Sequence, residues 1–274
     1  MPQSSPEFLN FGESAIFFYN CFAFSSPARF DRYLKAANGK HIEAMVLYRW
    51  NLRLCEALVP CLHSAELTLR NAIHRAMIEK YLPQTKPHFR GGSHPDDWWF
   101  DSTFNGTSVL GYGDSLKLVD AEKRIISDGK PVTTSNMVAE LPFGFWVELL
   151  NKEYEQSIIV PALQTTMKTL RKTRQDQGWL RDNFGRLRDL RNRASHHRPI
   201  FHRTDLTELN QVAWSVSREL QGFFVSPLSP ICRFKSVFEL DKEAEIASLR
   251  EQIRTGFYEP HRKATAADQE HPAK

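Results

Sequence analysis

Apolar residues recur at spacings of three and four positions along most of the chain, and no series of alternating apolar and polar residues marks a set of strands. Proline, glycine and capping residues divide this pattern into segments. The pattern therefore predicts a mainly α fold. The predicted helices cover 29–37, 41–59, 62–82, 114–128, 135–150, 161–174, 176–197, 205–224 and 241–254.

Breaks in the helical pattern define the predicted organisation of the chain. Asn38-Gly39, Pro60, Pro83 and Gly129 are the expected helix ends, Asp114 or Ser115 and Ser135 or Asn136 are the expected caps, and Leu141-Pro142 predicts a kink. A stretch rich in proline, glycine and polar residues over 84–113 predicts a long irregular insertion, which Trp98-Trp99-Phe100 should fix to the core.

Two segments are expected. Residues 1–225 should form a helical domain that holds the insertion, and residues 226–274 a C-terminal extension with one helix and a disordered end.

Charge is distributed unevenly. The 274 residues are 41% hydrophobic, enough for a substantial core, and carry a net charge of +4. Between positions 168 and 203 basic residues far outnumber Asp176, Asp182 and Asp189, so this stretch is expected to face a polyanion such as RNA. The basic residues are Lys168, Arg171, Lys172, Arg174, Arg181, Arg186, Arg188, Arg191, Arg193, Arg198 and Arg203.

Other features narrow the class of protein. The four cysteines show no C-x-x-C spacing, which favours buried thiols in a reducing compartment, and no signal peptide or membrane span is apparent, so a cytoplasmic location is expected. No glycine-rich phosphate loop is present, and the histidines and aspartates at 88, 94, 96 and 97 match no standard metal spacing. No cofactor or metal is therefore expected.

The most informative segment runs from Arg188 to Ile200, where a helix should end. At roughly 100° per residue, Asn192 and His196 lie about 40° apart on successive turns, and Arg191 lies about 140° from His196. An imidazole can accept the proton of a ribose 2′-hydroxyl near neutral pH, and an arginine can stabilise the charge that develops on the phosphate. Arg191, Asn192 and His196 are thus candidate catalytic residues for RNA cleavage without a metal.

The neighbours of these residues are candidates for RNA binding: Arg188, Arg193, His197 and Arg198. The imidazole of His197 is expected to face away from that of His196. A purely structural interpretation also exists, because basic residues at the C-terminal end of a helix are favoured by the helix dipole, and Pro199 is an ordinary stop signal.

A second polar group lies on the helix after Pro60 and contains Glu66, Arg70, Asn71 and His74. Glu66, Arg70 and His74 follow one another at i, i+4 and i+8 on an otherwise apolar helix. This stripe either borders the candidate site and supports Arg191 or His196, or forms an intrahelical salt bridge between Glu66 and Arg70.

Five ordered segments resemble the Abi-like family of bacterial abortive-infection proteins (the AbiD/AbiF type), which is similar to the HEPN superfamily. They cover roughly residues 26 to 225. The segments are Ser26 to Leu34, Leu47 to Asn51, Ala65 to Ile73, Leu141 to Trp146 and Leu190 to His197.

This resemblance implies a HEPN-like helical bundle with additional N-terminal helices that dimerises through two copies of an Arg-x(4–6)-His motif, matched here by Arg191, Asn192 and His196. It implies endonucleolytic RNA cleavage by 2′-hydroxyl attack in phage defence or as a toxin, with a structured noncoding RNA as a further partner. A dimer also agrees with the chemistry, because cleavage needs a base, a stabilising cation and preferably an acid.

Two alternatives from other classes stay open. One is a non-catalytic RNA-binding or sensor module in which Arg191 and His196 only grip phosphate, and a weaker one is a nucleotide-handling helical partner of a transferase.

Overall fold

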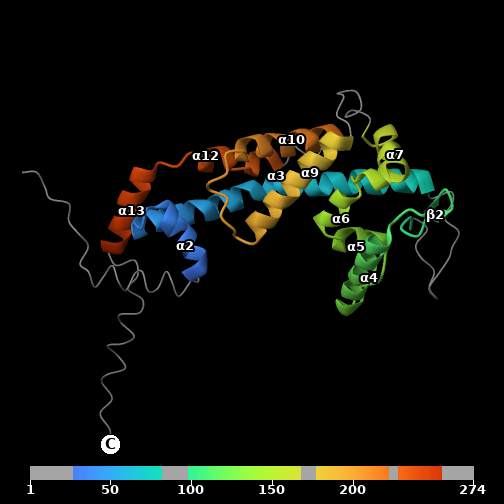
Figure 1. Cartoon of the computed structure of the whole chain (residues 1–274), viewed down its shortest axis with the longest axis horizontal. Coiled ribbons are helices and arrows are strands. Elements are labelled where there is room, and N and C mark those ends of the chain that lie inside the picture. The colour runs from blue at the N-terminus through green and yellow to red at the C-terminus, as the bar shows by residue number, and fades with distance from the viewer. Residues whose placement is uncertain (1–26, 82–97, 168–176, 222–227, 255–274) are drawn as a thin grey trace, which may run out of the picture. The chain divides into compact units, whose positions relative to one another are not determined.

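The computed structural model describes residues 27–81, 98–167, 177–221 and 228–254, and these are mainly helical (Figure 1). Short helices of other types are η2 (Lys152–Tyr154), η3 (Glu155–Ile159, a π-helix) and η4 (Ser229–Ile231). The α-helices are α2 (Pro27–Ala36), α3 (His41–Tyr81), α4 (Tyr112–Ser127), α5 (Thr134–Glu140), α6 (Phe143–Glu148), α7 (Val160–Gln164), α9 (Gln177–Ser195), α10 (Leu206–Gln221), α12 (Phe234–Phe238) and α13 (Lys242–Arg254).

The described residues form two compact units. The first contains residues 27–55, 199–202 and 235–254. In it, Val46 of α3 packs against Ile246 and Leu249 of α13, and the amide oxygen of buried Asn51 accepts hydrogen bonds from the backbone N–H groups of Ile200 (2.7 Å) and Phe201 (3.2 Å). Asn51 therefore holds the extended segment that follows the Arg188–Arg198 region.

The second unit contains residues 56–167, 177–198, 203–221 and 228–234. Here α9 packs against α6 and α10, and α4 packs against α5 (Figure 1). Leu180, Phe184, Leu187 and Leu190 form the fully buried face of α9, at the spacing of three and four residues that the sequence pattern predicted. This packing positions the last turn of α9.

The prediction that Pro60 ends a helix is wrong, because α3 continues without interruption from His41 to Tyr81. Proline removes one backbone hydrogen bond, here to the carbonyl of Glu56, a residue exposed to solvent. The flanking Leu58, Cys61 and Leu62 are buried. Ending the helix at Pro60 would shift these residues out of phase with the core, and burial of each large apolar side chain contributes about 1.5–3 kcal/mol.

Three helix ends share one geometry. Helices α2, α4 and α9 each end with a residue of positive φ: Asn38 (52°), Gly129 (70°) and His197 (50°). In each case the next residue's N–H bonds to the carbonyl five residues earlier. This pair of features is the Schellman motif, which satisfies the last carbonyls of a helix. The predicted stops at Asn38-Gly39 and Gly129 are thereby confirmed.

Some helices do not begin or end where the sequence predicted. Helix α4 begins at Tyr112 and not at a capping Asp114 or Ser115, because the Asp114 carboxylate is taken by the Tyr154 hydroxyl and by Lys117. The hydroxyl of Thr133 caps α5, and the expected kink at Leu141-Pro142 is a complete break between α5 and α6.

The predicted helix over 161–174 is also shorter, since α7 ends at Gln164. The hydroxyls of Thr165 and Thr166 donate to the carbonyls of Pro161 (2.9 Å) and Ala72 (2.8 Å), which competes with a further helical turn. Residues 168–174 and the expected cap Asp176 lie outside the described residues.

The part of the predicted insertion that the structure describes begins at Trp98 and is attached to the core as expected. Trp99 is fully buried, stacks on Phe100, and donates its indole N–H to Nδ1 of His74 on α3 (3.0 Å). A short hairpin follows, in which β1 (Thr103–Phe104) pairs antiparallel with β2 (Thr107–Ser108). The remainder of the predicted insertion, residues 84–97, lies outside the described residues.

Two other expectations concern the environment of the chain. Cys55 and Cys61 are buried free thiols, as predicted, and burial raises the pKa of Cys55 to about 11 and that of Cys61 to about 12. Cys232 is a free thiol that is only half-buried, so the prediction of burial is wrong for this residue, and Cys21 lies outside the described residues. Within the part of the chain that the structure describes, every helix is too short or too polar to cross a bilayer.

Replacing Pro60 with alanine should stabilise the protein, because it restores the hydrogen bond to the Glu56 carbonyl at a position that is already helical. We expect the free energy of unfolding to rise by about 1–3 kcal/mol, measured by urea denaturation. Val59→Ala at the neighbouring exposed position is the control and should change stability by less than about 0.7 kcal/mol. A Pro60→Ala protein less stable than wild type would contradict this account.

Candidate active site

The three candidate catalytic residues lie at the C-terminal end of α9. Arg191 is half-buried, Asn192 is exposed, and His196 is exposed one residue beyond the last helical position. The backbone N–H of His196 still donates to the carbonyl of Asn192 (3.2 Å), so the two residues lie one turn apart. Nη1 of Arg191 lies 3.4 Å from the amide oxygen of Asn192. The cation and the imidazole are thus on consecutive turns of one rigid element.

The structure brings Arg191 together with Glu66 of α3. Nε of Arg191 lies 3.4 Å from Oε2 of Glu66, whose side chain is only 17% exposed, while that of Arg191 is 39% exposed. A guanidinium has two edges that can form paired hydrogen bonds. Since Glu66 lies nearest Nε, the Nη1/Nη2 edge can still turn toward a phosphate. Glu66 therefore holds the arginine without occupying its outer edge.

The rest of the polar stripe on α3 divides into different roles. Nε of Arg70 is buried without a hydrogen-bond partner among the described residues, and burial lowers the pKa of this arginine while Glu66 raises it. His74 accepts a hydrogen bond from Trp99, so it supports the attachment of the insertion. Asn71 is half-buried, and no hydrogen bond within the described residues joins it to α9. Of the stripe, only Glu66 forms an ion pair with the candidate site.

Of the basic residues predicted to face a polyanion, most of those that the structure describes are paired with acids. Arg186 pairs with Asp205 and Glu208, Arg188 with Asp189, and Arg203 with Asp205. Arg193 and Arg198 form no ion pair with any residue that the structure describes. Unneutralised positive charge therefore gathers at the end of α9, around His196. Lys168, Arg171, Lys172 and Arg174 lie outside the described residues.

The backbone at His197 carries a feature that the sequence did not predict. His197 has φ of +50°, its N–H bonds to the carbonyl of Ala194 (3.0 Å), and the N–H of Arg198 bonds to that of Arg193 (2.8 Å). A left-handed conformation costs a residue with a side chain roughly 1–2 kcal/mol and is usually occupied by glycine or asparagine. Pro199 was the one available signal, since proline often follows such a cap.

Ion pairs between α9 and the start of α10 fix α9. Both Nη atoms of Arg186 bond to Glu208 (2.7 and 3.0 Å), and Nη2 also contacts Asp205 (3.3 Å). Arg203 forms a second bidentate contact with Asp205 (2.8 and 2.6 Å). These arginines, Arg203 first, lower the pKa of Asp205 to about 2, and Glu208 raises the pKa of Arg186.

Arg188 lies on the side of α9 that faces α6. A Cβ built on Gly144 would lie 3.8 Å from Cδ of Arg188, so the aliphatic part of this arginine covers the glycine. Its Nε and Nη2 both donate to Oδ1 of Asp189 (3.1 and 3.0 Å). Its charge is therefore partly neutralised by Asp189.

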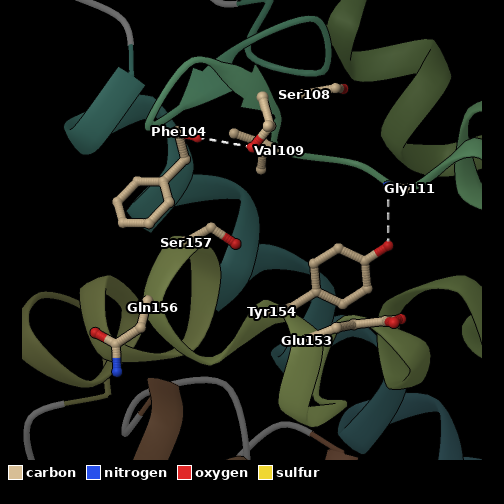
Figure 2. Close-up of a pocket in the computed structure, with 9 residues that line it drawn as sticks. Phe104, Ser108, Val109, Gly111, Glu153, Tyr154, Gln156 and Ser157 are labelled. Carbon is tan, nitrogen blue, oxygen red and sulfur yellow. Dashed lines mark hydrogen bonds between the residues drawn. The ribbon is translucent and has the colours of Figure 1, made fainter.

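A separate cavity of about 240 Å³ lies between the hairpin and the segment η2–η3 (Figure 2). Its wall includes Phe104, Gly111, Tyr154 and Ser157. The Tyr154 hydroxyl accepts the N–H of Gly111 (3.0 Å) and donates to buried Asp114. These contacts leave this hydroxyl no free donor, and none of the predicted site residues lines the cavity. Within the described residues no group of three or more potential metal ligands gathers.

Asp205→Asn should destabilise the protein at neutral pH, because it removes the charge on which Arg186 and Arg203 converge while keeping a side chain of nearly the same shape. The folded pKa of Asp205 is lowered from 3.8 to about 2, so its contribution is complete above pH 4 and is lost as the pH falls from about 4 to 2.

We expect wild type to exceed the variant by about 1–2 kcal/mol in free energy of unfolding at pH 7, and the two to converge near pH 2. Asp182→Asn, which removes an exposed pair with Arg181, is the control and should change stability by less than about 1 kcal/mol. A wild-type advantage at Asp205 that persists below pH 2 would contradict the assignment.

Comparison with known proteins identifies no family for this chain, since no family model, no curated protein and no solved structure matches it.

Proposed function

We propose that this chain is a metal-independent RNA endonuclease of the HEPN type that belongs with the Abi-like proteins and acts in the cytoplasm as an abortive-infection or toxin effector in phage defence. The observation that supports the proposal is the end of α9, where exposed His196 follows five residues after Arg191 and Arg191 is held by Glu66 from another helix. A base and a phosphate-binding cation are thus on one rigid support.

The reaction assigns one role to each residue. His196 accepts the proton of a ribose 2′-hydroxyl, whose oxygen then attacks the adjacent phosphorus. Arg191 stabilises the added negative charge on the phosphoryl oxygens, and Asn192 orients Arg191 through its amide oxygen. The 5′-oxygen leaves, and the product carries a 2′,3′-cyclic phosphate. No step needs a metal ion.

Charge supports RNA as the substrate. Arg193 and Arg198 flank the candidate base and are not neutralised by described acids, unlike Arg186, Arg188 and Arg203. Free cations beside a reactive group attract the phosphates of a nucleic acid, and this attraction weakens as salt rises. A structured noncoding RNA that restrains the protein would use the same cations.

The proposed enzyme is a homodimer. One chain presents one copy of the Arg191–His196 motif, and a two-fold axis brings an identical copy to the same place. Two motifs together supply a second arginine and further imidazoles to a single phosphate.

Replacing His196 with alanine should abolish cleavage, because it removes the base. We expect purified wild type, in EDTA, to convert total cellular RNA into fragments with cyclic-phosphate ends, and His196→Ala to be slower by at least about 100-fold. His63→Ala, which removes another exposed histidine of the same unit, is the matched control and should cleave as wild type does.

The outcomes separate the two main classes of function. RNA that stays intact with both proteins, while both bind it with similar affinity, would replace the ribonuclease with the non-catalytic binding module. Equal cleavage by wild type and His196→Ala would remove His196 from the mechanism.

Glu66→Gln should lower kcat without weakening RNA binding, because Glu66 positions Arg191 and its charge opposes the phosphates. We expect kcat to fall by about tenfold and KM to stay the same or fall, as for loss of an interaction that matters in the transition state. Glu79→Gln, at an exposed position of the same helix, should change neither constant. A higher kcat in Glu66→Gln would show instead that Glu66 blocks the site.

A further inference from the structure

The cap of α9 requires a residue with positive φ at position 197, but it does not require that this residue be a histidine. The same Schellman cap ends α2 with Asn38 and α4 with Gly129, the two residue types that adopt positive φ most readily. Helix α9 uses a histidine at the equivalent position, at φ of +50°. Its side chain is exposed, so the imidazole is not retained for packing.

The cap explains the positive φ but not the histidine, and a residue type that strains a cap more than glycine or asparagine would points to a function for the side chain. Glycine or asparagine would form the same cap with less strain. Solubility does not explain the histidine either, because a polar residue at any other surface position would contribute to it equally. The side chain that is kept at this position is an imidazole. It follows His196 directly and lies in the sequence between Arg193 and Arg198, neither of which forms an ion pair with a described residue.

The backbone gives this imidazole a direction that a helical residue cannot have. Changing φ from the helical value of about −63° to +50° rotates the Cα–Cβ bond by about 110° around the N–Cα bond. His196 continues the helical hydrogen bonding, whereas His197 leaves it. Two imidazoles therefore start from adjacent Cα atoms, roughly 3.8 Å apart, and leave the chain in different directions.

Two imidazoles placed in this way match the needs of the cleavage reaction. The attacking 2′-oxygen and the leaving 5′-oxygen lie on opposite sides of the phosphorus, and one needs to lose a proton while the other needs to gain one. We propose that His197 is the general acid that protonates the leaving 5′-oxygen, so that one chain carries both the base and the acid. This inference rests on the proposed ribonuclease.

The proton balance of the step is complete. Neutral His196 takes the 2′-hydroxyl proton, the new bond forms between the 2′-oxygen and phosphorus, and the bond between phosphorus and the 5′-oxygen breaks. The 5′-oxygen takes a proton from the imidazolium of His197. His196 ends protonated and His197 neutral, and exchange with water restores both.

The test uses His197→Asn, which removes the imidazole and keeps a residue that accepts positive φ. We expect the variant to fold with an unchanged melting temperature or one about 2 °C higher, since strain is relieved. Cleavage of an RNA oligonucleotide at one mapped linkage should nevertheless fall by about 100-fold or more. His197→Gly should behave in the same way.

A second substrate identifies the acid. When sulfur replaces the 5′-oxygen of the mapped linkage, the leaving group is a thiolate. Its conjugate acid has a pKa of about 8.5, far below that of a hydroxyl, so the thiolate departs without a proton donor. We expect His197→Asn to cleave this substrate within a few-fold of wild type. His196→Ala should stay inactive on it, because the 2′-hydroxyl must still lose its proton.

Three results would overturn the inference. Cleavage of the ordinary linkage by His197→Asn within a few-fold of wild type would mean that the acid comes from elsewhere, and an equal loss on both substrates would make His197 a binding contact. Failure of wild type itself to cleave either substrate would remove the ribonuclease and this inference together.

Discussion

Burial of the long apolar face of α3 is the constraint on which the rest of the structure depends. Leu58, Cys61, Leu62, Leu69 and Ile73 lie on this face with almost no exposed surface. Their burial outweighs the backbone hydrogen bond lost at Pro60, so one helix serves both compact units. Glu66 and His74 both lie on the part of this helix that follows Pro60.

Three sets of contacts within the second unit position helix α9. Its apolar face packs in the core, Arg186 ties it to α10, and Glu66 of α3 meets Arg191 near its end. The last turn then emerges from this support with His196 exposed. In the proposed ribonuclease, this position makes His196 accessible and gives it a fixed direction, which catalysis at a phosphate requires.

The sequence predicted much of the fold because the helical pattern is strong and the stops at Asn38-Gly39 and Gly129 have a local cause. It failed at Pro60, where burial on both sides outweighed a local signal, and at Thr165, where side-chain hydroxyls replaced backbone partners. Packing of α13 against Val46 could not be predicted, because nothing in either segment specifies the other.

The candidate site, like the fold, was predictable in part. The spacing of Arg191, Asn192 and His196 predicted that they lie together at the end of one helix. The polar stripe on α3 indicated that one of its members would contact them. Which member did so depended on the rotation of α3 relative to α9, which the sequence does not encode locally. The left-handed backbone of His197 was also hidden, because a histidine is not the residue that usually signals this cap.

The most direct measurement of the central claim uses wild-type protein in EDTA and two RNAs that differ at one cleaved linkage, where a single nucleotide either keeps or lacks its 2′-hydroxyl. If the end of α9 catalyses attack by this hydroxyl, cleavage disappears at the deoxy linkage and continues at the other sites of the same molecule. Cleavage that continues at the deoxy linkage would contradict the account, because another nucleophile would then be attacking the phosphorus.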